Sequence, residues 1–327
     1  MPAAAGSGQD YAAEPERLLV IKHGALGDFV QALGPMRAIR EAHPKAHITL
    51  LTTAPFAELG RRSGYVDDVW IDARPKWNPS AWLALRAKLR SGRFTRVYDL
   101  QTSGRSSRYF HLLPAPKPDW SGIPSGLPGG PGISHPHGNA RRNFMHTLDR
   151  QAEQLRMAGI SRVPPPDLSW ADADIGRFKL EPRFALLVPG GSAHRPEKRW
   201  PAERYATLAR ALAADGIQPV LIGANAETSL LAAIQAQAPK AANLGGRTGF
   251  FDLAALARHA KVAVGNDTGP MHLFAVAGAP CLVLFSAASD PVLCAPRGEQ
   301  VRVIRASRLD DVSVEEVLAG LALLRDL

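Results

Sequence analysis

The chain has 327 residues, a length that favours two domains over a single core. Hydrophobic residues make up 46% and charged residues 21%, as in a globular protein, and no apolar run approaches the length needed to cross a bilayer. The formal net charge of +9 is compatible with simple solubility, or with an anionic partner such as nucleic acid, a membrane surface or a phosphorylated substrate.

Residues 1–16 are small and polar and contain no apolar h-region, so we predict a disordered tail rather than a signal peptide. After them, short apolar runs bounded by turn residues alternate with amphipathic stretches, a pattern typical of parallel α/β units. Pro35 should kink the first helix or restart it. The elements predicted for this half are strands over 17–23, 47–53 and 96–101 and a helix over 29–43.

The middle of the chain has a different composition. Arginines and lysines concentrate between residues 86 and 108, where Asp99 is the single acid. The segment 113–140 is dense in Pro and Gly, so we expect no regular element there. It is either a disordered insertion or a mobile, acceptor-facing loop, and the basic residues that flank it favour the loop.

A second alternating series follows a proline-rich hinge near 162–174. We therefore expect one domain over 17–170 and another over 171–327, with the last helix packing back on the first domain. Two open α/β halves in tandem place ligands at the carboxyl ends of their strands, in the cleft between them. The predicted elements are strands over 183–191, 217–224, 261–267 and 280–286 and helices over 201–216, 226–239, 250–260, 269–279 and 312–327.

The loop after the first strand, KHGALGD, carries Gly24 and Gly27 and ends on Asp28. The glycines allow a tight turn and a close approach of a ligand to the backbone. Their spacing matches neither the dinucleotide fingerprint nor a P-loop. Asp28 either caps the following helix or acts as a general base that takes a proton from an acceptor hydroxyl.

The loop VPGGSAHRPEKRWP follows a strand of the second half. It combines the backbone N–H groups of Gly190 and Gly191, the hydroxyl of Ser192, and two cations, Lys198 and Arg199. A solvated basic loop is the alternative, but glycines at a strand end before a helix favour phosphate or diphosphate binding.

The most informative stretch is VGNDTGPMHLFAVAGAP. A buried strand ends in a polar turn that contains Asp267, Thr268 and Gly269, and the helix after it has His272 near its start. Such a helix N-terminus can hold an anion or a sugar hydroxyl. Glu227, at another helix start, either complements the helix dipole or accepts hydrogen bonds from a ribose.

The sequence lacks the motifs that are typical of metal-dependent and serine-hydrolase chemistry. The D-x-D at Asp172 and Asp174 lies in the hinge and precedes a strand, so we do not assign it a metal, and no HExxH or G-x-S-x-G is present. We expect no metal and no cofactor. Cys281 and Cys294 provide no disulfide framework, which fits a reducing cytoplasm.

Three of these stretches resemble, in order, the signatures of glycosyltransferase family 9, the heptosyltransferases of lipopolysaccharide core assembly, and DLQTSGRSSRY is similar to that family's acceptor-side segment. The resemblance implies a GT-B fold, in which two Rossmann-like doubly wound domains face each other across a cleft. It also implies inverting, metal-independent transfer of a heptose or related sugar, typically from ADP-heptose, to a lipopolysaccharide core or similar lipid-linked glycan.

The resemblance also assigns roles to residues. Asp28 matches the catalytic base. The donor contacts that it implies are Gly191, Ser192, Lys198, Glu227, Asp267, Thr268, Gly269 and His272. Candidates on the acceptor side are Gly27, Arg105, Arg108, Arg141 and Arg142.

The expected partners are the nucleotide-sugar donor, an anionic lipid-linked glycan and the anionic inner face of a membrane, touched peripherally by a cytoplasmic monomer. Nucleic acid is disfavoured because the basic groups lack interleaved aromatics and a recognisable module. The alternative from another functional class is a non-catalytic binder of nucleotides or anionic glycans on the same scaffold. It would bind the donor without hydrolysis or transfer.

Overall fold

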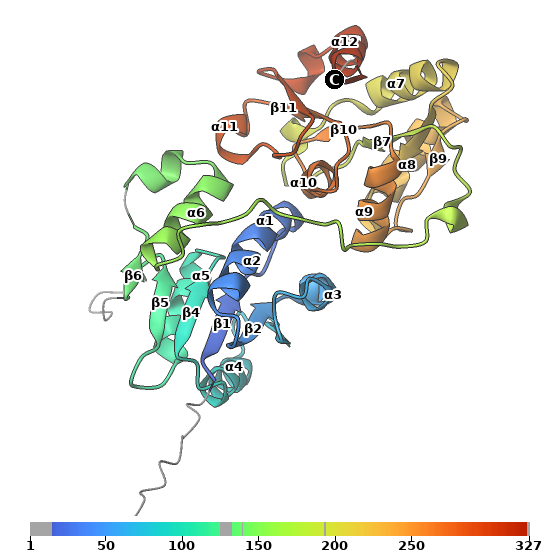
Figure 1. Cartoon of the computed structure of the whole chain (residues 1–327). Helices are drawn as coiled ribbons and strands as arrows, with labels where there is room; N and C mark the ends of the chain where they lie inside the picture. The colour runs from blue at the N-terminus through green and yellow to red at the C-terminus, as the bar shows by residue number, and fades with distance from the viewer. Residues whose placement is uncertain (1–14, 125–132, 139, 193, 326–327) are drawn as a thin grey trace, which may run out of the picture.

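The computed structural model describes residues 15–124, 133–138, 140–192 and 194–325. Over these residues the chain forms two parallel six-stranded sheets, which Figure 1 shows as two lobes joined by a long crossing segment. The strand orders are β3-β2-β1-β4-β5-β6 and β12-β11-β10-β7-β8-β9. The predicted pair of doubly wound α/β units is confirmed. The strands of the two sheets lie on either side of the expected boundary at residue 170, whose exact position stays a prediction.

Among the described residues, the amino-terminal half contains the first sheet and six α-helices. Its strands are β1 (Arg17–Ile21), β2 (His47–Thr52), β3 (Asp68–Ile71), β4 (Arg96–Asp99), β5 (Asp119–Gly122) and β6 (His135–Pro136). Its helices are α1 (Leu26–Gln31), α2 (Leu33–Ala42), α3 (Ala57–Arg62), α4 (Pro79–Ser91), α5 (Gly104–Arg108) and α6 (Thr147–Met157).

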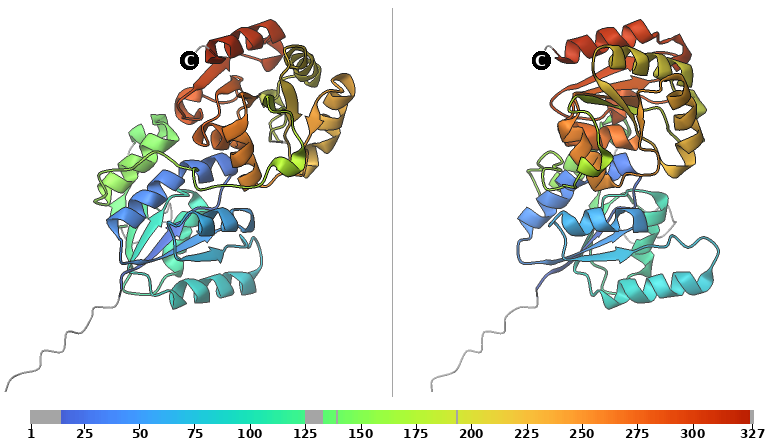
Figure 2. Two further views of the ribbon diagram at one scale, coloured as in Figure 1. Left: turned by 45° about the vertical axis from the view of Figure 1, so that its right-hand side comes forward. Right: turned by 90° about the vertical axis from the view of Figure 1, so that its right-hand side faces the viewer.

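The carboxyl-terminal half repeats this organisation. Its strands are β7 (Phe184–Val188), β8 (Gln218–Leu221), β9 (Ala242–Asn243), β10 (Val262–Asn266), β11 (Cys281–Phe285) and β12 (Val301–Arg305). Its helices are α7 (Ala202–Ala214), α8 (Thr228–Gln237), α9 (Phe250–His259), α10 (Gly269–Val276), α11 (Pro291–Cys294) and α12 (Val314–Arg325). Figure 2 shows these helices on both faces of the strands.

Most positions of the central strands are apolar because helices cover both faces of each sheet. In β1, Leu18 and Val20 belong to one hydrophobic cluster, whereas Leu19 and Ile21 belong to the cluster on the other face, and all four are fully buried. A strand buried in this way fixes the direction of the loop that leaves its carboxyl end. The predicted ligand loops start from such strands.

Two expectations about the architecture were wrong. Segment 113–140 contains β5 and β6, which extend the first sheet, because the fully buried Trp120 packs its ring edge-on against Phe110 despite the Pro- and Gly-rich surroundings. Residues 125–132 and 139 of this segment, like most of the predicted tail over 1–16, lie outside the described residues. The last helix, α12, packs on β11, β12 and α7 of its own half rather than on the amino-terminal half.

The two halves share one hydrophobic cluster, which includes residues of both sheets. Within it, the rings of Phe29 and Phe56 stack with centroids 5.0 Å apart, and Phe56 stacks on Phe250 of the other half at 5.5 Å. Apolar packing therefore joins the two halves. Within the described part of the chain, no helix is both long and apolar enough to cross a membrane.

Candidate active site

Asp28 lies in the first turn of α1, at the carboxyl end of β1. The turn before it requires glycine, because Gly24 has a φ of +120° and a Cβ there would lie 2.3 Å from the Phe56 ring. The N-cap position is held by Ala25, and among the described residues no side chain caps this helix. Capping therefore does not explain Asp28, whose side chain is exposed and lines a cavity.

On the opposite side, the loop after β7 is shaped by Glu227. One carboxylate oxygen accepts from the N–H of Gly191 and the other from the N–H of Ala224, both at 2.8 Å. A Cβ at Gly190 would fall 1.8 Å from the same carboxylate, so only glycine fits. Arg199 holds the loop from the other side by donating to the Gly191 carbonyl at 2.7 Å. In this structure Glu227 positions the loop, and its contact with a ribose stays a prediction.

Lys198 reaches the turn after β10. Its ammonium donates to Asp267 at 2.6 Å, and the hydroxyl of Ser289 donates to the same carboxylate oxygen at 2.7 Å. A lysine ammonium has three protons, so this ion pair leaves donors for a further anion. Ser192 lies exposed in the same loop as Lys198, as the sequence predicts.

Asn266 connects these two loops from inside the protein. Its amide nitrogen donates to the carbonyls of Pro189 and Gly190, each at 3.0 Å. Its amide oxygen accepts from the N–H of Trp200 at 3.0 Å and from the hydroxyl of Tyr205 at 3.2 Å. This role of Asn266, the last residue of β10, was not predicted from the sequence, because it depends on long-range partners.

The N-terminus of α10 faces the amino-terminal half. Its N-cap residue, Thr268, has a buried hydroxyl without a hydrogen-bond partner among the described residues. The amide nitrogen of Gln31 lies 3.1 Å from Nδ1 of His272. Because an amide nitrogen only donates, Nδ1 accepts and the ring proton is on Nε2. Burial lowers the pKa of His272 to about 4, so the imidazole is neutral at physiological pH.

Two glycines allow the halves to meet here. A Cβ on Gly27 would lie 2.6 Å from the His272 ring, and a Cβ on Gly269 would lie 2.8 Å from Leu26. The charges of Asp28 and Asp267 both act on the pKa of His272 and on that of Cys294, which burial raises to about 11. Asp28 and Asp267 therefore both lie in the neighbourhood of His272 and Cys294, where α1 packs on α10.

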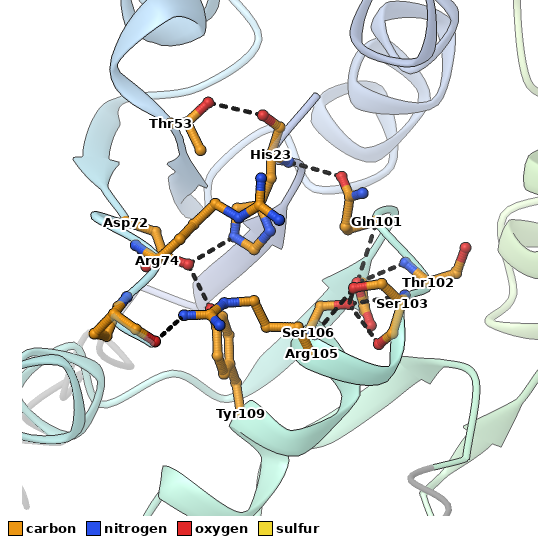
Figure 3. A network of polar contacts seen from close by, with 12 residues as sticks. His23, Thr53, Asp72, Arg74, Gln101, Thr102, Ser103, Arg105, Ser106 and Tyr109 are labelled. Carbon is orange, nitrogen blue, oxygen red and sulfur yellow. Dashed lines mark hydrogen bonds and ion pairs between the residues drawn. The ribbon is translucent and has the colours of Figure 1, made fainter. Parts of the chain in front are cut away.

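The predicted arginines are not all at this site. Figure 3 shows Arg105 in a network of the amino-terminal half, where it donates to the hydroxyl of Tyr109 at 3.0 Å and to the carbonyl of Pro75 at 2.6 Å. Asp72, which accepts from Tyr109 and lies 3.0 Å from His23, completes that network. The acceptor role of Arg105 stays a prediction.

The other three arginines differ in position. Arg108 ends α5 with its side chain exposed, and Arg141 is exposed in the 3-10 turn Ala140–Phe144. Arg142 from the same turn lines the cavity beside Asp28. Within the described ranges, no group of three or more His, Cys, Asp or Glu residues is arranged to hold a metal ion.

The cavity beside Asp28 has a volume of about 230 Å³. Its walls include several side chains that sequence analysis did not assign to a site. They come from the residue after β1, from the segment after β4 and from α6, which no single stretch of sequence brings together. These residues are Lys22, Gln101, Thr147, Arg150, Gln151 and Gln154.

Comparisons with known proteins agree with this arrangement. The family model described as Glycosyltransferase family 9 (heptosyltransferase) matches residues 144–317, which is more than half of the chain. Lipopolysaccharide heptosyltransferase 2 of Salmonella typhimurium is 36% identical over 323 residues, and the Escherichia coli protein of the same name is 27% identical over 320 residues. Each alignment covers 88% of this chain and 88% of the relative.

Among solved structures, the E. coli ADP-heptose lps heptosyltransferase II is similar, with a TM-score of 0.78 and 24% sequence identity. The match covers 94% of this chain and 98% of that one. This likeness confirms the GT-B fold that the sequence motifs predict.

Proposed function

The chain belongs to glycosyltransferase family 9, and from this premise we propose that it transfers a heptose from ADP-heptose to an acceptor of the lipopolysaccharide core. The observation that carries the proposal is the exposed carboxylate of Asp28, which does not cap its helix and which lies next to Gly27, the residue that meets His272 of the carboxyl-terminal half. The relatives are lipopolysaccharide heptosyltransferases, which supports the heptosyl class, and the similar solved E. coli protein is an ADP-heptose heptosyltransferase, which supports the ADP donor.

In the proposed reaction, the diphosphate of the donor lies against the carboxyl-terminal loops. Lys198, Ser192 and the N–H of Gly269 at the start of α10 supply donors for its oxygens. The unpartnered hydroxyl of Thr268 points to a further hydrogen bond with the donor. The positive charge of Lys198 stabilises the departing diphosphate, so the proposal requires no metal.

Asp28 acts on the acceptor. Its carboxylate takes the proton of an acceptor hydroxyl, whose oxygen attacks the anomeric carbon on the face opposite the diphosphate. The bond from that carbon to the diphosphate oxygen breaks, ADP leaves, and the configuration at the anomeric carbon inverts. His272 is neutral and carries its proton on Nε2, so it is suited to donate a hydrogen bond rather than to act as the base.

Substitution of Asp28 tests this proposal. Asp28→Asn keeps the size of the side chain and removes the base, so we expect ADP-heptose to bind as in the wild type while transfer falls by at least about 100-fold. Calorimetric titration measures binding, and mass spectrometry of the glycan product measures transfer. Near-full turnover of the Asn variant would exclude Asp28 as the base.

We also propose that the protein works in the cytoplasm, as a monomer that contacts the inner membrane through α4. Trp77, next to the start of α4, is 95% exposed, and Leu83 on α4 is 62% exposed. Lys76 and Arg86 line the same surface. Exposed apolar side chains flanked by cations are typical of an interfacial helix on an anionic bilayer.

Vesicle binding tests the membrane contact. We expect the protein to sediment with vesicles that contain phosphatidylglycerol and to bind weakly to pure phosphatidylcholine. The double variant Trp77→Ser/Leu83→Ser should lose most of this binding without losing transfer to a water-soluble acceptor. Equal sedimentation of the variant and the wild type would contradict the assignment of this surface.

A further inference from the structure

The cavity beside Asp28 is small and strongly polar. Its volume of about 230 Å³ is below the usual range for a pocket that holds a drug-sized ligand, so it fits a substituent or a single small group rather than an oligosaccharide. Asp28 forms part of its wall, so a group bound there lies next to the proposed base.

Three cations face this cavity, Lys22, Arg142 and Arg150. Lys22 is only 3% exposed, and its ammonium donates to the carbonyl of Leu100 at 3.1 Å, which leaves two of its protons without that partner. Burial, opposed by the charges of Asp28 and Asp99, lowers the pKa of Lys22. The lysine is therefore a costly buried charge.

The arginines of the cavity add to this excess of positive charge. Burial and the nearby charge of Arg150 both lower the pKa of Arg142. The two acids that act on these groups are Asp28, at the cavity wall, and Asp99, which is fully buried and whose pKa burial raises to about 6. Like charges held close together in a desolvated place are stabilised by an anion that binds between them.

Two glutamines give the cavity a second chemical property. Gln151 and Gln154 are 4% and 1% exposed, and each has a side-chain oxygen without a hydrogen-bond partner among the described residues. The orientation of Gln154 is fixed because its amide nitrogen donates to the carbonyls of Asp99 and Ser121, at 3.0 and 3.3 Å. Buried acceptors without partners are costly, and a hydroxyl group is the donor that would satisfy them.

We propose that this cavity binds the anionic group, a carboxylate or a phosphate, of the acceptor sugar that carries the reacting hydroxyl. Lys22 and Arg150 hold the anion, and the oxygens of Gln151 and Gln154 accept from neighbouring hydroxyls of the same sugar. The inference rests on the proposed function, because it places the anion beside the base Asp28. It makes acceptor charge a condition for efficient transfer.

The first experiment measures the anion site without any reaction. With the donor site saturated by ADP, inorganic phosphate should raise the melting temperature of the wild type in a saturable way. Lys22→Met and Arg150→Gln should each abolish this increase. Arg156→Gln, a control on the exposed face of α6, should retain it.

Arg150→Gln keeps this test valid if the buried Lys22 variant fails to fold. Persistence of the phosphate effect in Arg150→Gln and any folded Lys22→Met would place the ion elsewhere and overturn the proposal. Loss of the effect in the wild type once ADP is added would assign the ion to the donor site, which overturns it as well.

The second experiment uses transfer to matched acceptors. One glycan is compared with its carboxyl-reduced form and with its dephosphorylated form, which distinguishes the two sources of charge. We expect one of these neutral forms to lower kcat/KM of the wild type by about 10- to 100-fold, and Arg150→Gln to lose this discrimination. Equal kcat/KM for all three acceptors in the wild type would overturn the proposal.

The two ideas fail in different ways. If Asp28→Asn turns over normally, the base assignment fails while the phosphate measurement is unaffected. If the phosphate effect does not depend on Lys22 or Arg150, the anion site fails while the result for Asp28 is unaffected.

Discussion

The two sides of the cleft differ in how completely their polar groups are satisfied. On the carboxyl-terminal side, Asn266 makes four hydrogen bonds, and both oxygens of Glu227 accept from backbone N–H groups. On the amino-terminal side, buried oxygens of Asp99, Gln151 and Gln154 have no partner among the described residues. Apart from the hydroxyl of Thr268 and Nε of Arg199, which also have no partner among the described residues, the donor loops are thus preorganised, whereas the cavity beside Asp28 is arranged for groups that a ligand supplies.

The largest expected effect comes from removing Asn266, whose hydrogen bonds hold the loops of the carboxyl-terminal side. Asn266→Ala leaves two carbonyls and an N–H without this partner in a buried place, so the free energy of unfolding should fall by about 3 kcal/mol. Urea denaturation measures the change. The matched control is Asn143→Ala in an exposed turn, expected within about 0.5 kcal/mol of the wild type. Equal losses in the two variants would remove the contrast between the two sides.

The second largest effect should come from removing Lys198, the cation on the carboxyl-terminal side. Lys198→Met removes a charged donor from the proposed diphosphate site and leaves Asp267 without its ion pair, so affinity for ADP should fall by about 10- to 100-fold. Arg195→Met, in the same loop but exposed, is the control. Calorimetry with ADP alone is the measurement, and unchanged affinity in Lys198→Met would show that the diphosphate binds elsewhere.

On the amino-terminal side, the buried carboxyl group of Asp99 should make the free energy of unfolding depend on pH. Burial raises the pKa of Asp99 from 3.8 to about 6, so the folded state holds this proton more tightly than the unfolded chain. The resulting stability is fully present below about pH 4 and is lost as the pH rises through about 6.

Relative to Asp99→Asn, the wild type should therefore lose about 2 kcal/mol of unfolding free energy across this window. The Asn variant retains an oxygen that can accept from the N–H groups of Gln101 and Thr102. Urea denaturation from pH 4 to 7 measures the difference between the two proteins. Parallel pH profiles would mean that the Asp99 carboxylate is satisfied after all.

The smallest effect concerns the ion pair that joins the two halves at the surface. Arg297 and Asp149 make two contacts of 2.6 Å, but both side chains are about half exposed. A double-mutant cycle with Arg297→Met and Asp149→Ala should give a coupling below about 1 kcal/mol. A larger coupling would mean that charge, rather than the apolar contact through Phe56 and Phe250, holds the lobes together.

Sequence patterns predicted the parts of the site that depend on local order along the chain. Asp28, Lys198 and Asp267 lie in the segments that leave the carboxyl ends of buried strands, and the carboxyl ends of parallel strands meet at one edge. The partners of Asn266 and the wall of the cavity were not predictable in this way. Lys22 and Gln154, for example, come together only because α6 packs beside β5 and α1.

The same reasoning explains the elements that were missed or misjudged. β3 and β12 are outer strands with exposed positions, so they lack the apolar runs by which β1 and β7 were predicted. β5 was not predicted because prolines and glycines surround it in the sequence, although its Trp120 forms part of the core. Short edge strands depend on their neighbours more than on their own composition.

The contact of Gly27 with His272 and of Gly269 with Leu26 has a consequence for how this enzyme changes through evolution or engineering. Each lobe presents a backbone surface without a side chain to the other, so neither position tolerates a larger residue unless the helices separate. Chimeras that join the lobes of different relatives should therefore remain active only when both parents contribute a glycine at this crossing.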